Sequence, residues 1–65
     1  MRIKVNGHDY ELPDGTDIHA LLAARQLTPD KVAVELNRRL LRGEKYDVAL
    51  KEGDEVEIVT FVGGG

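Results

Sequence analysis

Cysteine and serine are both absent from this sequence of 65 residues. Without cysteine, neither a disulfide nor a thiolate metal site can stabilise the fold, and the redox compartment cannot be inferred. Without either residue, the chain cannot use a cysteine or serine nucleophile in covalent catalysis. At this length we expect one small domain, whose single core contributes only about 3–5 kcal/mol to stability.

Motifs for nucleotides and metals are also missing. The glycines before the C-terminus are isolated, and none of them begins a P-loop or a dinucleotide fingerprint. The two histidines, His8 and His19, are eleven positions apart with no matching ligand set, so no metal site is predicted. Without these motifs and without a cysteine or serine nucleophile, the chain is not expected to catalyse a reaction by itself. It could still be a protein on which enzymes act.

Charge and hydropathy predict a soluble, cytoplasmic protein. The net charge of −3 argues against nucleic acid as the main partner, because binding to phosphates depends on clustered positive charge. The sequence shows no signal peptide, and no apolar run approaches the roughly 18 residues needed to cross a bilayer. We therefore expect neither nucleic acid nor a membrane among its partners.

The first element predicted is a β-hairpin over residues 2–12. Asn6-Gly7 is a favoured pair for a type I′ turn, and it lies between two alternating runs. A two-residue loop fixes the register, so that one face is apolar and the other pairs opposite charges. The predicted apolar face consists of Ile3, Val5, His8, Tyr10 and Leu12, and the predicted charge pairs are Arg2 with Glu11 and Lys4 with Asp9.

One main helix is predicted after the turn at residues 13–15. Thr16 is the candidate N-cap, and residues 17–26 carry a single apolar face. We expect the turn at residues 28–30 to end the helix, because proline cannot continue it. The apolar face consists of Ile18, Leu21 and Leu22.

A strand is predicted over residues 32–36, and a basic cluster follows it. Arg38, Arg39 and Arg42 surround the pair Leu40-Leu41. We interpret this segment as a solvated turn with the two leucines tucked beneath it. A phosphate or RNA site is the alternative, and the acidic total charge favours the turn.

The last strand is predicted over residues 55–61, and its two faces differ. One face is Val56, Ile58 and Thr60, whereas the other begins with Glu55 and Glu57 and ends with Val59 and Phe61. An exposed apolar cluster often marks a binding surface. The sequence leaves open whether Val59 and Phe61 are exposed or lie beneath a loop.

Three glycines, Gly63, Gly64 and Gly65, end the chain directly after Val62. Glycine costs entropy to order and adds nothing to a core, so a small domain gains no stability from them. A glycine tail is instead a slim peptide that carries its carboxylate about 10 Å beyond the anchor and can enter a narrow active site. On the tail alone, a disordered terminus or a cloning scar is an equal alternative.

The order of these elements resembles the ubiquitin-like β-grasp fold, and the chain resembles the thiamine-biosynthesis sulfur carrier family. The resemblance covers the whole chain. It implies an α+β fold with a mixed sheet, one main helix across one face, and the first and last strands parallel and adjacent at the centre. The β-grasp domain would span residues 1–62 and the flexible glycine tail residues 63–65. The resemblance to the family rests on Val34-Glu35-Leu36-Asn37, Arg42, Tyr46, residues 51–58 and the terminal glycines.

The resemblance also implies a function for the tail. In this family an adenylating, E1-like enzyme uses ATP and Mg²⁺ to convert the C-terminal carboxylate, here that of Gly65, to an acyl-adenylate. A cysteine-derived sulfur donor then yields a thiocarboxylate, which supplies sulfur to a thiazole synthase. The chain would be a carrier that binds no cofactor or metal and is not an enzyme. We expect its partners to contact Val59, Phe61 and Val62 beside the tail residues Gly63 and Gly64.

Other functions remain open at this point. A β-grasp sulfur carrier for molybdopterin or for tRNA thiolation would have the same fold and the same tail chemistry. A β-grasp interaction module would use the glycines only as an inert linker. RNA binding through Arg38, Arg39 and Arg42 predicts an affinity that falls steeply with salt.

Overall fold

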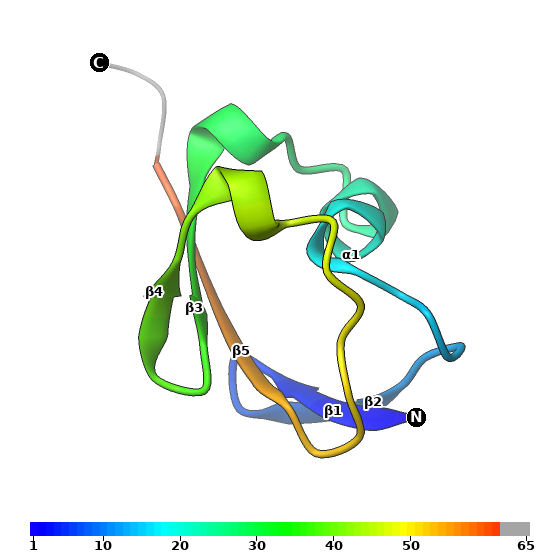
Figure 1. Cartoon of the computed structure of the whole chain (residues 1–65). Helices are drawn as coiled ribbons and strands as arrows, with labels where there is room; N and C mark the ends of the chain where they lie inside the picture. Colours follow the sequence, from blue (N-terminus) through cyan, green and yellow to red (C-terminus); the bar gives the residue numbers. More distant parts are fainter. Residues whose placement is uncertain (62–65) are drawn as a thin grey trace.

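The computed structural model describes residues 1–61, which form a mixed five-stranded sheet and one α-helix (Figure 1). The strand order is β2-β1-β5-β3-β4. The predicted parallel contact between the first and last strands is confirmed, with Lys4 opposite Glu55 and Val5 opposite Val56. The predicted boundary between domain and tail lies outside the described residues. The elements are β1 (Arg2–Val5), β2 (His8–Glu11), α1 (Ile18–Ala24), η1 (Pro29–Lys31), β3 (Val32–Leu36), β4 (Arg39–Leu41), η2 (Gly43–Lys45) and β5 (Glu55–Thr60), where η1 and η2 are single 3₁₀ turns.

The β1–β2 hairpin has the predicted register, but its apolar face is only half buried. Ile3 and Val5 of β1 are buried, whereas every residue of β2 is exposed. The register places His8 and Tyr10 on the same face as Val5 and Ile3, as predicted, but neither residue is buried. The reason is that β2 is an edge strand, where the Arg25 guanidinium lies 5.0 Å from the centre of the Tyr10 ring and leaves that ring 40% exposed.

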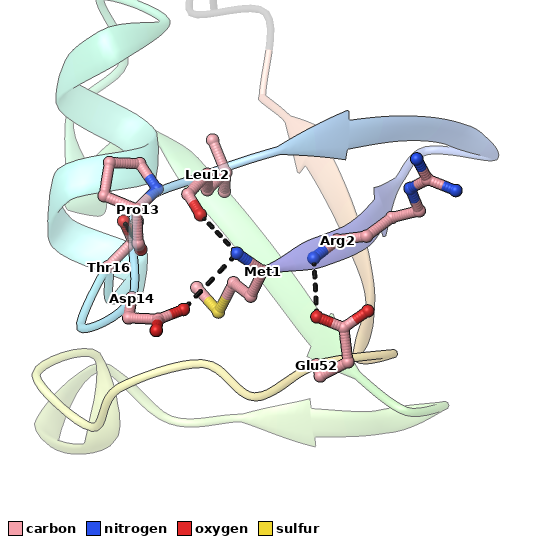
Figure 2. Close-up of polar contacts among 7 residues, drawn as sticks. All are labelled: Met1, Arg2, Leu12, Pro13, Asp14, Thr16 and Glu52. Atoms are coloured by element: carbon pink, nitrogen blue, oxygen red, sulfur yellow. Dashed lines mark hydrogen bonds and ion pairs between the residues drawn. The ribbon is translucent and has the colours of Figure 1, made fainter.

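The N-terminus is tied to the turns on either side of it (Figure 2). The Met1 ammonium donates to the Leu12 carbonyl at 2.7 Å and to the Asp14 carboxylate at 3.3 Å. The Leu12 amide donates back to the Met1 carbonyl at 2.8 Å, which extends the hairpin ladder by one pair. The Arg2 amide donates to the Glu52 carboxylate at 2.9 Å. Together these bonds fix the segments that lead into α1 and β5.

Helix α1 is shorter than predicted, and its N-cap is Asp17 rather than Thr16. The Asp17 carboxylate accepts a hydrogen bond from the Ala20 amide at 2.8 Å. Thr16 lies one residue before the cap, and its hydroxyl donates to the Pro13 carbonyl at 2.7 Å. The predicted buried face is confirmed: Ile18, Leu21 and Leu22 are all buried.

The helix ends at a Schellman motif, before the proline that was predicted to end it. The Leu27 amide donates to the Leu22 carbonyl at 2.9 Å, and the Gln26 amide donates to the Ala23 carbonyl at 3.0 Å. Gln26 has a φ of 60°, which places it in the left-handed region. Glycine is the usual residue at this position of the motif, so the sequence lacked the expected stop signal.

Gln26→Gly is expected to stabilise the protein by about 1 kcal/mol, because a side chain in the left-handed region costs roughly that amount. The melting temperature should rise by roughly 4–8 °C. Ala23→Gly is the matched control, since it places the same residue inside the helix and should destabilise by about 1 kcal/mol. Thermal unfolding of both variants checks the pair. If both changes lower the melting temperature, the backbone at residue 26 carries no relievable strain.

The core lies between the sheet and α1 and is closed by the segment that follows η2. Tyr46 in that segment is only 4% exposed, and its carbonyl accepts from the amides of Ile18 and His19 at 3.1 and 3.3 Å. The Leu50 amide donates to the Thr16 carbonyl at 2.8 Å. This segment therefore satisfies amides at the start of the helix that lack partners within it. The buried residues are Ile3, Val5, Ile18, Leu21, Leu22, Val32, Val34, Tyr46, Leu50, Val56 and Ile58.

Residues 36–41 form a second hairpin, where the sequence predicted only a solvated turn. Asn37 and Arg38 have φ values of 51° and 70° and form the two-residue turn between β3 and β4. Because successive residues of a strand point to opposite faces, Leu40 and Leu41 cannot both lie beneath the turn. Leu41 packs against the core, whereas Leu40 is 64% exposed. The prediction that both leucines are tucked away was wrong for Leu40.

Candidate functional site

The candidate site is the end of β5, where the chain leaves the sheet toward its C-terminus. Val59 is 58% exposed and Phe61 is 56% exposed, so no loop among residues 1–61 covers them. This settles the alternative that the sequence left open. Val59 lies opposite Ala33 on the outer face of the sheet, and the neighbouring Ile58 is buried in the core. We refer to Val59 and Phe61 as the exit patch.

The other predicted site residues lie beyond the part of the chain that the structure describes. These are Val62, whose contact with partners is predicted, and the tail residues Gly63, Gly64 and Gly65. The structure therefore positions the strand that leads to the tail. It brings together Val59 and Phe61 from the predicted set.

Hydrogen bonds from both sides fix the end of β5. On the β3 side, the Phe61 amide donates to the Lys31 carbonyl at 2.9 Å. On the other side β1 has ended at Val5, and the Asn6 side chain takes the place of a strand. Its Oδ1 accepts from the Ile58 amide at 2.7 Å, and its Nδ2 donates to the Ile58 carbonyl at 3.3 Å. The base of the tail is thus held by a rigid part of the sheet.

The sequence does not reveal this role of Asn6, because the turn propensity of Asn-Gly already accounts for an asparagine at that position. Asparagine has a φ of 51° here, as a type I′ turn requires. Glycine adopts the same backbone conformation equally well, but it has no side-chain carboxamide to bond with Ile58. The choice of Asn before Gly7 is the only signal in the sequence for this second role.

Carboxylates precede the exit patch on the outer face. The sequence predicted that Arg2 and Lys4 would lie beside Glu55 and Glu57. Lys4 is opposite Glu55, but Glu57 lies opposite Glu35 of β3, so the prediction was wrong for Glu57. Because β1 and β5 are parallel, moving toward Glu57 leads away from Arg2, whose guanidinium pairs instead with Glu11 at 3.0 Å.

Two further features bear on which chemistry the described residues can perform. Among residues 1–61 there is no group of three or more His, Cys, Asp or Glu side chains placed to hold a metal ion. No helix in the same range is both long enough and apolar enough to cross a bilayer.

The pKa of Asp30, next to the residue that anchors Phe61, lies below its ordinary value. The main cause is a hydrogen bond from the Thr28 side chain, and the second is a hydrogen bond from the backbone amide of Asp30 itself. Asp30 therefore stays ionised beside Lys31, whose carbonyl anchors Phe61.

Known proteins that resemble this chain point to one family. Residues 3–65 match the model of the ThiS family. The chain is 42% identical over 65 residues to the sulfur carrier protein ThiS of Bacillus subtilis, with 97% of this chain and 98% of that protein covered. It is 41% identical over 66 residues to a thiazole synthase of Magnetococcus marinus. That match covers 100% of this chain but 20% of the relative, so the chain spans about one fifth of that relative's length.

Solved structures agree with these matches. The crystal structure of the thiamine biosynthesis protein ThiS from Geobacter metallireducens has a TM-score of 0.80 and 35% identity, with 100% of both chains covered. A ubiquitin-like protein from Caldiarchaeum subterraneum shares the fold at a TM-score of 0.56 and 19% identity, covering 98% of this chain and 100% of that one. The predicted ubiquitin-like β-grasp fold is thus confirmed. With a family model over nearly its whole length and relatives at this identity, the chain belongs to the ThiS family.

Proposed function

We propose that the Gly65 carboxylate is the functional group of this chain, and that it cycles between carboxylate, acyl-adenylate and thiocarboxylate. The coarser assignment follows from the family: a small sulfur carrier protein of thiamine biosynthesis that is not itself an enzyme. The observation that carries the finer proposal is a sequence ending in three glycines and containing no cysteine or serine. Such a chain has no side-chain nucleophile of these kinds on which to carry sulfur, and it has the slimmest peptide at its end.

The proposed chemistry overcomes the low reactivity of a carboxylate. An α-carboxyl group has a pKa of about 3.5, so it is ionised at neutral pH and is a poor electrophile. Transfer of AMP from ATP forms a mixed anhydride and releases pyrophosphate, and the activating enzyme contributes positioning and charge stabilisation. Sulfur derived from cysteine and delivered at the oxidation level of sulfide then attacks the acyl carbon, AMP leaves, and a thiocarboxylate remains. ATP and Mg²⁺ are bound by the activating enzyme in this scheme, not by the carrier.

Two partner enzymes follow from this scheme, an adenylating E1-like enzyme and a thiazole synthase. The second is supported by thiazole synthases of Magnetococcus marinus and Paramagnetospirillum magneticum, which contain a stretch similar to 100% of this chain. In those relatives a stretch similar to this chain is part of the same polypeptide as the enzyme, which supports a partnership between the two. The exit patch is the proposed contact, because it is apolar, exposed and directly precedes the tail.

Intact-mass spectrometry tests the proposed function. The chain is incubated with a candidate adenylating enzyme, ATP, Mg²⁺ and a sulfur donor, and its C-terminal peptide should gain the mass difference of one sulfur replacing one oxygen. Deleting Gly65 should remove that gain. Parallel reactions with activating enzymes of molybdopterin synthesis and tRNA thiolation distinguish the alternative carriers. Sulfur mapped to any other residue, or a tail that no activating enzyme modifies, would show the assignment to be wrong.

Phe61→Ala should weaken binding to a partner enzyme by about 1–3 kcal/mol, as expected for a modest hot spot. Because Phe61 is 56% exposed, the melting temperature should change little. Val48→Ala is the control, since Val48 is 55% exposed but lies before the turn that leads into β5, away from the exit patch. Calorimetric titration of both variants against the activating enzyme gives the comparison. The exit patch is refuted if Phe61→Ala unfolds the domain while affinity per folded molecule is unchanged.

A further inference from the structure

Strand β4 is an edge of the sheet, and no strand among residues 1–61 pairs with its outward side. Arg39 pairs with Leu36 next to the two-residue turn, and Leu41 pairs with Val34. Residues that flank such a turn share hydrogen bonds, and bonded pairs alternate along an antiparallel ladder. The N–H and C=O groups of Leu40 therefore point away from β3, and no backbone group within residues 1–61 bonds to them. Free groups of this kind are a template for a further strand.

A groove of about 380 Å³ lies along this edge, between β4 and η2. Three leucines and four charged residues line it. None of the three cations forms an ion pair within 4.0 Å with another residue of the described range. The groove thus combines an apolar surface with a net positive rim. Its lining is Leu36, Leu40, Leu41, Arg39, Arg42, Lys45 and Glu44.

The groove extends to the end of the molecule from which the tail departs. Leu41 lies opposite Val34, and Val34 lies opposite Ile58. Strands β4 and β5 therefore run in the same direction, and the chain after Leu41 continues level with the end of β5. Figure 1 shows η2 at this end of the sheet. The groove therefore lies at the same end of the sheet as the exit patch.

We propose that the β4–η2 groove binds an extended acidic peptide segment of a partner protein, which adds to β4 as a further strand. The free peptide groups of Leu40 would bond to the backbone of that segment, as in other cases of strand addition. Alternate side chains of a strand point to opposite faces, so carboxylates of the segment can reach Arg39 on one face of β4 while its apolar residues contact Leu40 on the other. Charge complementarity selects an acidic segment over a basic one.

The same cations could in principle bind RNA, but the surroundings favour a peptide. A nucleic acid would use the positive rim and leave the Leu40 peptide groups and the leucine surface unused. A short cationic edge also protects against aggregation. That protective role alone does not account for a leucine that is 64% exposed at the centre of the edge.

Titration followed by NMR tests the proposal with defined probes. These are a blocked hexapeptide of alternating glutamate and valine, its counterpart with lysine, and a short oligouridine. We expect the glutamate peptide alone to shift the amides of β4 and η2 and to slow exchange of the Leu40 amide. Arg39→Glu should weaken its binding about tenfold. Lys51→Glu makes the same charge change outside the groove and should leave binding unchanged.

N-methylation of the Leu40 amide, introduced by chemical synthesis, separates strand addition from charge attraction. That amide has no hydrogen bond within the described chain, so the modified protein should fold normally. It should no longer bind the glutamate peptide. N-methylation of Leu41, whose amide belongs to the ladder, should destabilise the hairpin and serves as the folding control. The proposal is wrong if methylated Leu40 binds as before, if no β4 amide responds to the glutamate peptide, or if oligouridine is the probe that binds. The experiment needs no sulfur loading, so its outcome is separate from that of the proposed function.

Discussion

Gly64→Val should abolish sulfur loading of the C-terminus without changing the melting temperature. In the proposed scheme the terminal carboxylate must reach ATP inside an enzyme, and a path that admits a bare backbone is closed to a branched side chain. Positioning errors of about 1 Å can lower catalysis roughly a hundredfold, so we expect a loss of at least that size. The fold should be unaffected because the buried core within residues 1–61 is built from the sheet, α1 and the segment after η2. Intact mass after a fixed reaction time measures the loaded fraction.

Gly43→Val is the matched control for this change. A Cβ at Gly43 meets no atom within 4 Å, so the same substitution adds no clash there. This variant should load as the unmodified chain does. Normal loading of Gly64→Val would mean that the activating enzyme does not enclose the tail, and the proposal of a narrow path would be wrong. A fall in melting temperature of Gly64→Val would instead indicate that the tail packs on the domain.

The parts of the fold that sequence predicted well are those in which several local signals agree. In the first hairpin, the Asn6-Gly7 turn, the alternation and the charge pairs all require one register, and the structure has that register. The last strand was equally well marked by its alternation and by the turn before it. Local agreement of this kind is what allows a single sequence to specify an element.

The errors occurred where a decisive signal was either missing or tertiary. The backbone becomes left-handed at Gln26, two residues after the end of α1, and glutamine gives no warning of that conformation. The turn of the second hairpin uses Arg38 where glycine is usual, so β4 was not recognised as a strand. Burial on β2 depends on how far the core extends beneath an edge strand, which periodicity does not encode.

The candidate site was only partly accessible to sequence reasoning. Alternation placed Val59 and Phe61 on one face, but their exposure depends on whether any other segment crosses that face. The clamp of Asn6 on Ile58 joins residues that are 52 positions apart, and no local pattern indicates such a contact. The groove at β4 was missed for the same reason as the strand that forms it.

Tyr46→Ala is expected to unfold most of the protein at room temperature. Tyr46 is 4% exposed, and truncating a buried aromatic residue costs about 3–5 kcal/mol. The single core of a domain this small contributes only about 3–5 kcal/mol, so the loss consumes nearly all of the stability. Urea unfolding followed by circular dichroism measures it. Its ring also packs against that of His19, with the centroids 5.8 Å apart and the planes at 72°, so the start of α1 should be disturbed as well.

Tyr46→Phe is the control that separates the ring from its hydroxyl. Within residues 1–61 no side-chain polar atom is buried without a hydrogen-bond partner, the Tyr46 hydroxyl included. Removing this hydroxyl should therefore cost less than about 1 kcal/mol. The carbonyl that receives the Ile18 and His19 amides is retained in both variants, so the difference between them reports the ring alone. If Tyr46→Ala remains folded with a loss below about 1 kcal/mol, the segment after η2 is not part of the core. If the Phe variant unfolds too, the hydroxyl rather than the ring holds that segment, and the packing argument fails.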